Sequence, residues 1–74
     1  MTPPVLLYVR AGCPHCDAVR ARLAARGATV TEIDVAKRRA AIPELLKLTG
    51  GRRVVPVVVE EGVVSVAPEG GTEF

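Results

Sequence analysis

Two cysteines dominate the chemistry that this sequence can perform. Cys13 and Cys16 are the only cysteines of the chain, and Pro14 and His15 separate them. A pair at this spacing can close a disulfide in the first turn of a helix or hold a nucleophilic thiolate at the helix N-terminus. It can also bind a metal. An apolar run precedes the motif and a helical pattern follows it, so the cysteines lie at a strand-to-helix junction.

Cys13 is the predicted nucleophile of this motif, because the thiolate is the reactive species in disulfide exchange. At a helix N-cap its sulfur would face free N–H groups and the positive end of the helix dipole, which lower a thiol pKa. Arg10 and His15 can add positive charge nearby. Cys16 lies one turn further on and is expected to be more buried and to resolve a mixed disulfide. Pro14 fits the first helical position, where a missing N–H costs nothing.

Other interpretations of the motif remain open at this point. The cysteines could form a structural staple, although a staple across so short a loop contributes little to stability. A closed zinc site normally needs four ligands, whereas the chain offers two cysteines and His15 without a second cluster. A two-thiolate copper(I) site or an iron–sulfur cluster shared by two chains is a further alternative. His15 either donates to the Cys13 thiolate or is simply an exposed ring.

The elements that must position the motif follow from apolar patterning and from turn residues. Strands are predicted over 5–9, 28–35, 54–59 and 63–67, and helices over 14–26 and 37–49. Gly27 ends the first helix, and Pro43 either opens or kinks the second. The order βαβαββ predicts an α/β fold with a four-stranded mixed sheet, a right-handed first crossover and a final antiparallel hairpin.

Pro56 interrupts the apolar run of the third predicted strand. A proline in a central strand argues against regular pairing, so it could mark an edge or a turn into the strand. It could also follow a cis peptide bond, which would turn the backbone of Val55 towards a ligand. The residues alone leave this choice open.

Length and composition limit the class of protein. The chain has 74 residues, which predicts a single domain over 1–74, and its net charge of +2 offers no basis for nucleic-acid binding. No apolar segment is long enough for a membrane span, and no signal sequence is visible, so we expect a cytoplasmic protein with reduced thiols. Several arginines cluster; they form solvated faces or hold the carboxylates of an anionic thiol such as glutathione.

These residues together resemble the glutaredoxin family, which has a thioredoxin-like fold. The matching features cover nearly the whole chain: Tyr8, Arg10, Cys13-Pro14-His15-Cys16, Ile33-Asp34, Thr49-Gly50-Gly51-Arg52, Val55-Pro56 and Gly70-Gly71. The resemblance implies a thiol–disulfide oxidoreductase that reduces protein disulfides or glutathione mixed disulfides, with Cys13 as nucleophile and Cys16 as resolving thiol.

The resemblance also implies substrate-binding roles. Val55-Pro56 would form a cis-proline loop whose Val55 backbone pairs with glutathione, and Arg10 would meet a glutathione carboxylate. Gly70, Gly71 and Thr72 would lie near the γ-glutamyl end, and Arg52 or Arg53 near the glycyl end. Glutathione is then the co-substrate, with no tightly bound cofactor and no metal. The implied partners are protein disulfides and either glutathione or thioredoxin reductase, and the chain would be a monomer or weak homodimer.

Departures from the family pattern keep two alternatives in view. His15 stands where the family usually has tyrosine, and the motif is similar to the CPHC of strongly oxidising periplasmic thiol oxidases. Val54 replaces a usual threonine, and Thr72-Glu73 follow the glycines where aspartates are common. The final helix of the family is also expected to be absent. Reduction by thioredoxin reductase, and a metal or iron–sulfur carrier function for the CxxC thiolates, are therefore the alternatives.

Overall fold

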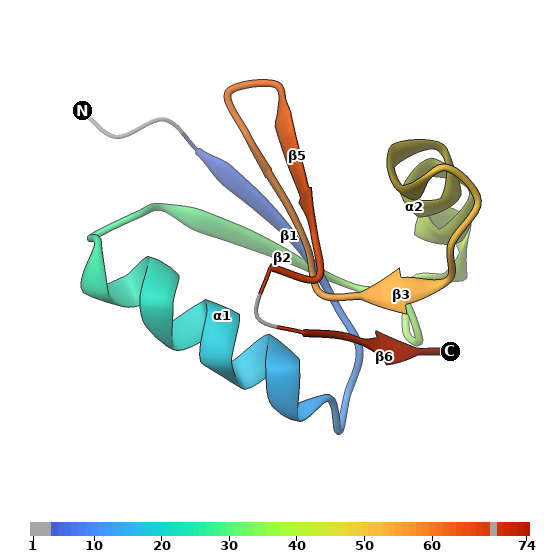
Figure 1. Cartoon of the computed structure of the whole chain (residues 1–74), viewed down its shortest axis with the longest axis horizontal. Helices are drawn as coiled ribbons and strands as arrows, with labels where there is room; N and C mark the ends of the chain where they lie inside the picture. Colours follow the sequence, from blue (N-terminus) through green and yellow to red (C-terminus); the bar gives the residue numbers. More distant parts are fainter. Residues whose placement is uncertain (1–3, 69) are drawn as a thin grey trace.

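A four-stranded sheet with one α-helix on each side forms the centre of the computed structural model (Figure 1). The structure describes residues 4–68 and 70–74 of the predicted 1–74 domain. Strands β1 (Val5–Val9) and β2 (Val30–Asp34) are parallel, whereas β4 (Val57–Glu60) and β5 (Val63–Val66) follow as an antiparallel hairpin. The strand order is β2-β1-β4-β5. The predicted α/β fold and its mixed sheet are therefore confirmed.

Strand β1 is one of the two interior strands of the sheet. It pairs with β2 on one side and with β4 on the other, so that Leu7 lies opposite both Glu32 and Val58. Both sheet faces are covered at this position, which explains why β1 is a continuous apolar run rather than an alternating one. Leu7 is completely buried, and Tyr8 is nearly so. The C-terminal end of this well-anchored strand leads directly to the cysteine motif.

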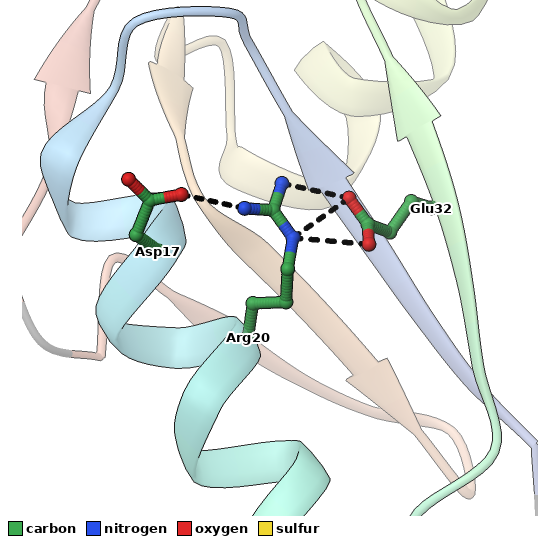
Figure 2. A network of polar contacts seen from close by, with 3 residues as sticks. All are labelled: Asp17, Arg20 and Glu32. Carbon is green, nitrogen blue, oxygen red and sulfur yellow. Dashed lines mark hydrogen bonds and ion pairs between the residues drawn. The ribbon is translucent and has the colours of Figure 1, made fainter.

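Helix α1 (Pro14–Ala25) covers one face of the sheet and begins where the sequence predicts. Pro14 occupies its first turn, and Gly27, with φ of 68°, follows its end. Arg20 joins the helix to the sheet edge, because its guanidinium contacts Asp17 at 2.6 Å and Glu32 of β2 at 2.8 Å (Figure 2). These three side chains are partly exposed, so each ion pair contributes about 1 kcal/mol or less. These contacts therefore make only a small contribution to the packing of α1 on the sheet.

Helix α2 (Ile42–Thr49) covers the other face and is shorter than predicted. A 3-10 turn, η1 (Arg39–Ala41), precedes it, so Pro43 opens the helix rather than kinking a longer one. Gly50, with φ of 71°, ends the helix in a left-handed conformation that favours glycine. The predicted helix over 37–49 was therefore too long at its start.

The predicted strand over 54–59 is two strands that belong to different sheets. Strand β3 (Val54–Val55) pairs with β6 (Thr72–Glu73) in a separate two-stranded sheet, whereas β4 continues the main sheet after Pro56. Proline has no N–H to donate to a ladder, which suits the point where pairing changes partner. β6 was not predicted, because two polar residues after two glycines show no strand pattern. The Val55–Pro56 peptide bond is cis, which settles the alternative left open by the sequence.

Candidate functional site

The cysteine motif joins the end of β1 to the start of α1. Gly12, with φ of 81°, makes the turn that brings the chain into the helix. Cys13 is the N-cap residue, with extended backbone angles, and the backbone N–H of Cys16 donates to its carbonyl at 3.2 Å. Both cysteines carry free thiols and are buried, Cys16 at 1% exposure and Cys13 at 5%. Cys16 is thus the more buried of the two, as the sequence predicts.

The environment of Cys13 favours its thiolate. Burial is the largest single influence on the pKa of Cys13 and raises it. Hydrogen bonds with the Cys16 thiol and the Thr72 hydroxyl lower it, as do those from the backbone N–H groups of Cys16 and His15. The hydrogen bonds together outweigh burial, so the pKa lies below its ordinary value. Cys13 is therefore the thiol better prepared for nucleophilic attack.

The environment of Cys16 has the opposite effect. The pKa of Cys16 is raised to about 12, chiefly by burial, and the hydrogen bond and negative charge of Cys13 act in the same direction. A hydrogen bond with the Arg10 backbone and the positive charge of Arg20 act in the opposite direction but do not offset the rise. The two thiols, three residues apart, are thus clearly differentiated, one towards thiolate and one towards thiol.

Two segments that are distant in sequence complete the surroundings of the Cys13 sulfur. The Sγ atom lies 4.0 Å from the carbonyl oxygen of Val55 and 3.5 Å from Oγ1 of Thr72. Val55 and Thr72 are opposite each other in the β3–β6 pair, and Pro56 follows Val55 through the cis bond. The structure therefore brings these three predicted site residues together beside Cys13.

The two glycines of the predicted site permit close backbone approaches. A Cβ atom on Gly70 would lie 3.0 Å from Cε1 of His15, so the imidazole lies against the Gly70 backbone. A Cβ atom on Gly71 would lie 2.7 Å from both Val54 and Ala67 side chains, a distance that packed atoms do not tolerate. Glycine at both positions therefore lets the segment before β6 lie against the motif and β3. The predicted electrostatic role of His15 remains a prediction.

Arg10, which precedes the cysteine motif in the sequence, lines a cavity of about 460 Å³. Arg39 and Arg53 line the same cavity, and the ring of Phe74 lies under the Arg53 guanidinium, 5.4 Å from centroid to Cζ. No acidic side chain is among the described residues that line it. The sequence singled out Arg10 and Arg53, whereas Arg39 was only one of several clustered arginines; the η1 turn brings it here. By contrast, Arg20 and Arg26 form ion pairs with Glu32 and Glu60.

Within residues 4–68 and 70–74, no three His, Cys, Asp or Glu side chains gather closely enough to hold a metal ion. Neither helix in these ranges has the length and apolar character that a membrane crossing needs.

Comparison with known proteins adds an independent line of argument. The sequence profile of the glutaredoxin family matches residues 5–64, which include Arg10, the CPHC motif and Val55-Pro56. Among solved structures, the chain is similar to the crystal structure of the glutaredoxin (grx-1) from Archaeoglobus fulgidus, with a TM-score of 0.77 and 27% sequence identity. The match covers 99% of this chain and 78% of that one. No curated protein matched the sequence. Taken with the fold and the paired thiols, the profile match over most of the chain shows that it belongs to the glutaredoxin family.

Proposed function

We propose that this chain reduces glutathione mixed disulfides and protein disulfides, with Cys13 as the attacking thiol. The observation that carries the proposal is the position of Cys13: an N-cap cysteine with a lowered pKa beside the cis Val55–Pro56 bond. The family and fold favour a thiol–disulfide oxidoreductase over the metal-carrier alternative.

The reaction follows from the two thiols. The Cys13 thiolate attacks the glutathione sulfur of a mixed disulfide, forms a Cys13–glutathione disulfide and releases the other sulfur as a thiolate, which takes a proton from water. A second glutathione thiolate then attacks the glutathione sulfur, giving oxidised glutathione and returning Cys13 as a thiolate. The net reaction consumes one free glutathione for each mixed disulfide: the substrate regains its thiol, and both glutathione moieties leave together as oxidised glutathione.

Cys16 offers a second route that suits protein disulfides. After Cys13 has formed a mixed disulfide with a substrate protein, the Cys16 thiolate attacks Cys13 Sγ and releases the reduced substrate. Cys16 must first lose its proton. In the free protein its pKa of about 12 keeps almost all of it in the thiol form at neutral pH. Once Cys13 is part of a disulfide, its negative charge and its hydrogen bond no longer raise the Cys16 pKa, but burial still does. Resolution of a protein mixed disulfide therefore depends on deprotonation of the buried Cys16, whereas reduction of a glutathione mixed disulfide does not use Cys16.

The arginine-lined cavity supports glutathione as the co-substrate. Arg10 connects it to the motif, because the backbone N–H of Cys13 donates to the Arg10 carbonyl at 3.3 Å. Guanidinium groups suit carboxylates, to which they can donate two parallel hydrogen bonds. We propose that the glycyl carboxylate of glutathione occupies this cavity while its sulfur reaches Cys13. The γ-glutamyl end would then lie near Gly70, Gly71 and Thr72.

The proposal is tested by NADPH consumption with a glutathione mixed disulfide, glutathione and glutathione reductase. We expect turnover with this system and much slower turnover with thioredoxin reductase in place of glutathione and its reductase. Turnover with thioredoxin reductase alone would keep the oxidoreductase but exclude glutathione as reductant. No turnover with either reductase would contradict the proposal. We further propose that the chain works in a reducing compartment such as the cytoplasm, as a monomer or weak homodimer.

Removal of an arginine from the cavity should weaken substrate binding more than chemistry. We expect Arg10→Ala and Arg39→Ala each to raise the KM for a glutathione mixed disulfide about three- to tenfold, since an exposed charge pair contributes about 1 kcal/mol. The kcat should stay within about twofold. The increase should shrink at high salt, because salt screens exposed charges.

Arg38 provides the matched control for this measurement. It is exposed, lies next to Arg39 and is not among the residues that line the cavity. Arg38→Ala should therefore leave the KM unchanged while removing the same charge. An equal rise in KM for all three variants would mean that net charge, rather than this cavity, attracts the substrate.

A further inference from the structure

The Thr72 hydroxyl is placed to act on the reacting sulfur itself. Thr72 lies on β6 opposite Val55, and its Oγ1 is 3.5 Å from Cys13 Sγ, within hydrogen-bond distance for the larger sulfur atom. The Cys13 side chain is buried and that of Thr72 is half-buried, so little water competes for this contact. The contact joins residues 59 positions apart and depends on the β3–β6 pair.

The two oxygen atoms near Cys13 Sγ differ in what they can do when the thiol ionises. In the thiol form, the S–H can donate to the Val55 carbonyl at 4.0 Å or to Thr72 Oγ1 at 3.5 Å. After the proton leaves, the sulfur can only accept. A carbonyl has no proton to donate, whereas a hydroxyl rotates and becomes a donor. Thr72 is thus the one of these two neighbours that can stabilise the thiolate.

We propose that the Thr72 hydroxyl is a catalytic group that donates a hydrogen bond to the Cys13 thiolate. This inference rests on the proposed function, in which Cys13 is the nucleophile, and adds a role to the substrate-binding one that the family resemblance implies. The two atoms lie within reach of this bond in the structure, at 3.5 Å. The bond serves again when glutathione cleaves the Cys13–glutathione disulfide, because Cys13 Sγ then leaves as a thiolate and needs the same donor.

The pH dependence of Cys13 alkylation separates this role from a structural one. The reduced full chain is treated with iodoacetamide at a series of pH values, and mass spectrometry locates the label. Cys16, with a pKa of about 12 and 1% exposure, should not react below pH ~10, so the midpoint reports Cys13. The variants are Thr72→Val, which removes the hydroxyl at nearly constant shape, and Thr72→Ser, which retains it.

We expect Thr72→Val to raise the alkylation midpoint by about one pH unit, the size that loss of a hydrogen bond to a charged group produces. Thr72→Ser should stay within about 0.3 units of the unmodified chain. Thr31→Val makes the same chemical change on an exposed position of β2 and should leave the midpoint unchanged. Turnover with a glutathione mixed disulfide at neutral pH should fall with Thr72→Val and recover with Thr72→Ser.

Two outcomes would overturn the inference. A midpoint unchanged in Thr72→Val would show that the hydroxyl does not stabilise the thiolate, even if the alkylation rate changed at every pH through altered access. An equal shift in Thr72→Val and Thr72→Ser would assign the effect to backbone displacement of β6. If Cys13 of the unmodified chain ionised at the ordinary pH of a free thiol, the proposed function itself would fail, which is a separate result.

Discussion

Replacement of Cys13 by serine is expected to reduce turnover of glutathione mixed disulfides below about 0.1% of the unmodified chain, because a hydroxyl is not ionised at neutral pH. Cys13 is the thiol whose pKa is lowered and whose sulfur faces the cis-proline loop. Initial rates in the coupled NADPH assay with glutathione reductase measure the effect.

Replacement of Cys16 by serine is the matched control and should give a different pattern. Its hydroxyl keeps a hydrogen-bond donor near Cys13, so turnover of glutathione mixed disulfides should stay above about a tenth of the unmodified rate. Reduction of a protein disulfide should fall much further, because that route uses the Cys16 thiol. Full activity in Cys13→Ser, or equal loss in both variants on both substrates, would contradict the assignment of Cys13 as nucleophile and Cys16 as resolving thiol.

Replacement of Leu7 by alanine is expected to remove a large part of the free energy of unfolding. Leu7 is completely buried at the centre of β1, between β2 and β4. Deleting a buried leucine side chain costs about 2–5 kcal/mol through lost burial and the cavity that remains. A domain of 74 residues has little surplus stability, about 5 kcal/mol at the low end of the usual range. Urea unfolding of the reduced chain, followed by circular dichroism, measures the loss.

Val63 offers the comparison position for this experiment. It lies on the edge strand β5 and is 65% exposed, so Val63→Ala should change the free energy of unfolding by about 0.5 kcal/mol or less. Activity of Leu7→Ala should fall in parallel with the folded fraction, since the substitution leaves the thiols unchanged. Similar stability losses for the two variants would mean that β1 is not the centre of the core.

Much of the fold follows from local patterns in the sequence. The apolar run of Val5–Val9 and the glycine at position 27 each depend on a few adjacent residues, and the elements formed as predicted. The same holds for the strand-to-helix junction at Cys13, because proline after it and a helical pattern beyond it are local signals. The differences arose where a pattern could not show its partner. The single apolar run over 54–59 forms two strands, β3 and β4, that belong to different sheets. The short β6, which pairs with β3, shows no strand pattern in the sequence.

The sequence by itself determined the kind of chemistry and where it begins: two thiols at the N-terminus of a helix that follows a buried strand. Local hydrophobic periodicity and backbone preferences decide such features, and they are visible along the chain. Only the tertiary structure decided which distant groups surround the Cys13 sulfur. Pairing of β3 with β6 places the Thr72 hydroxyl there, and the η1 turn adds Arg39 to the cavity of Arg10. These contacts depend on long-range packing, which no spacing in the sequence encodes.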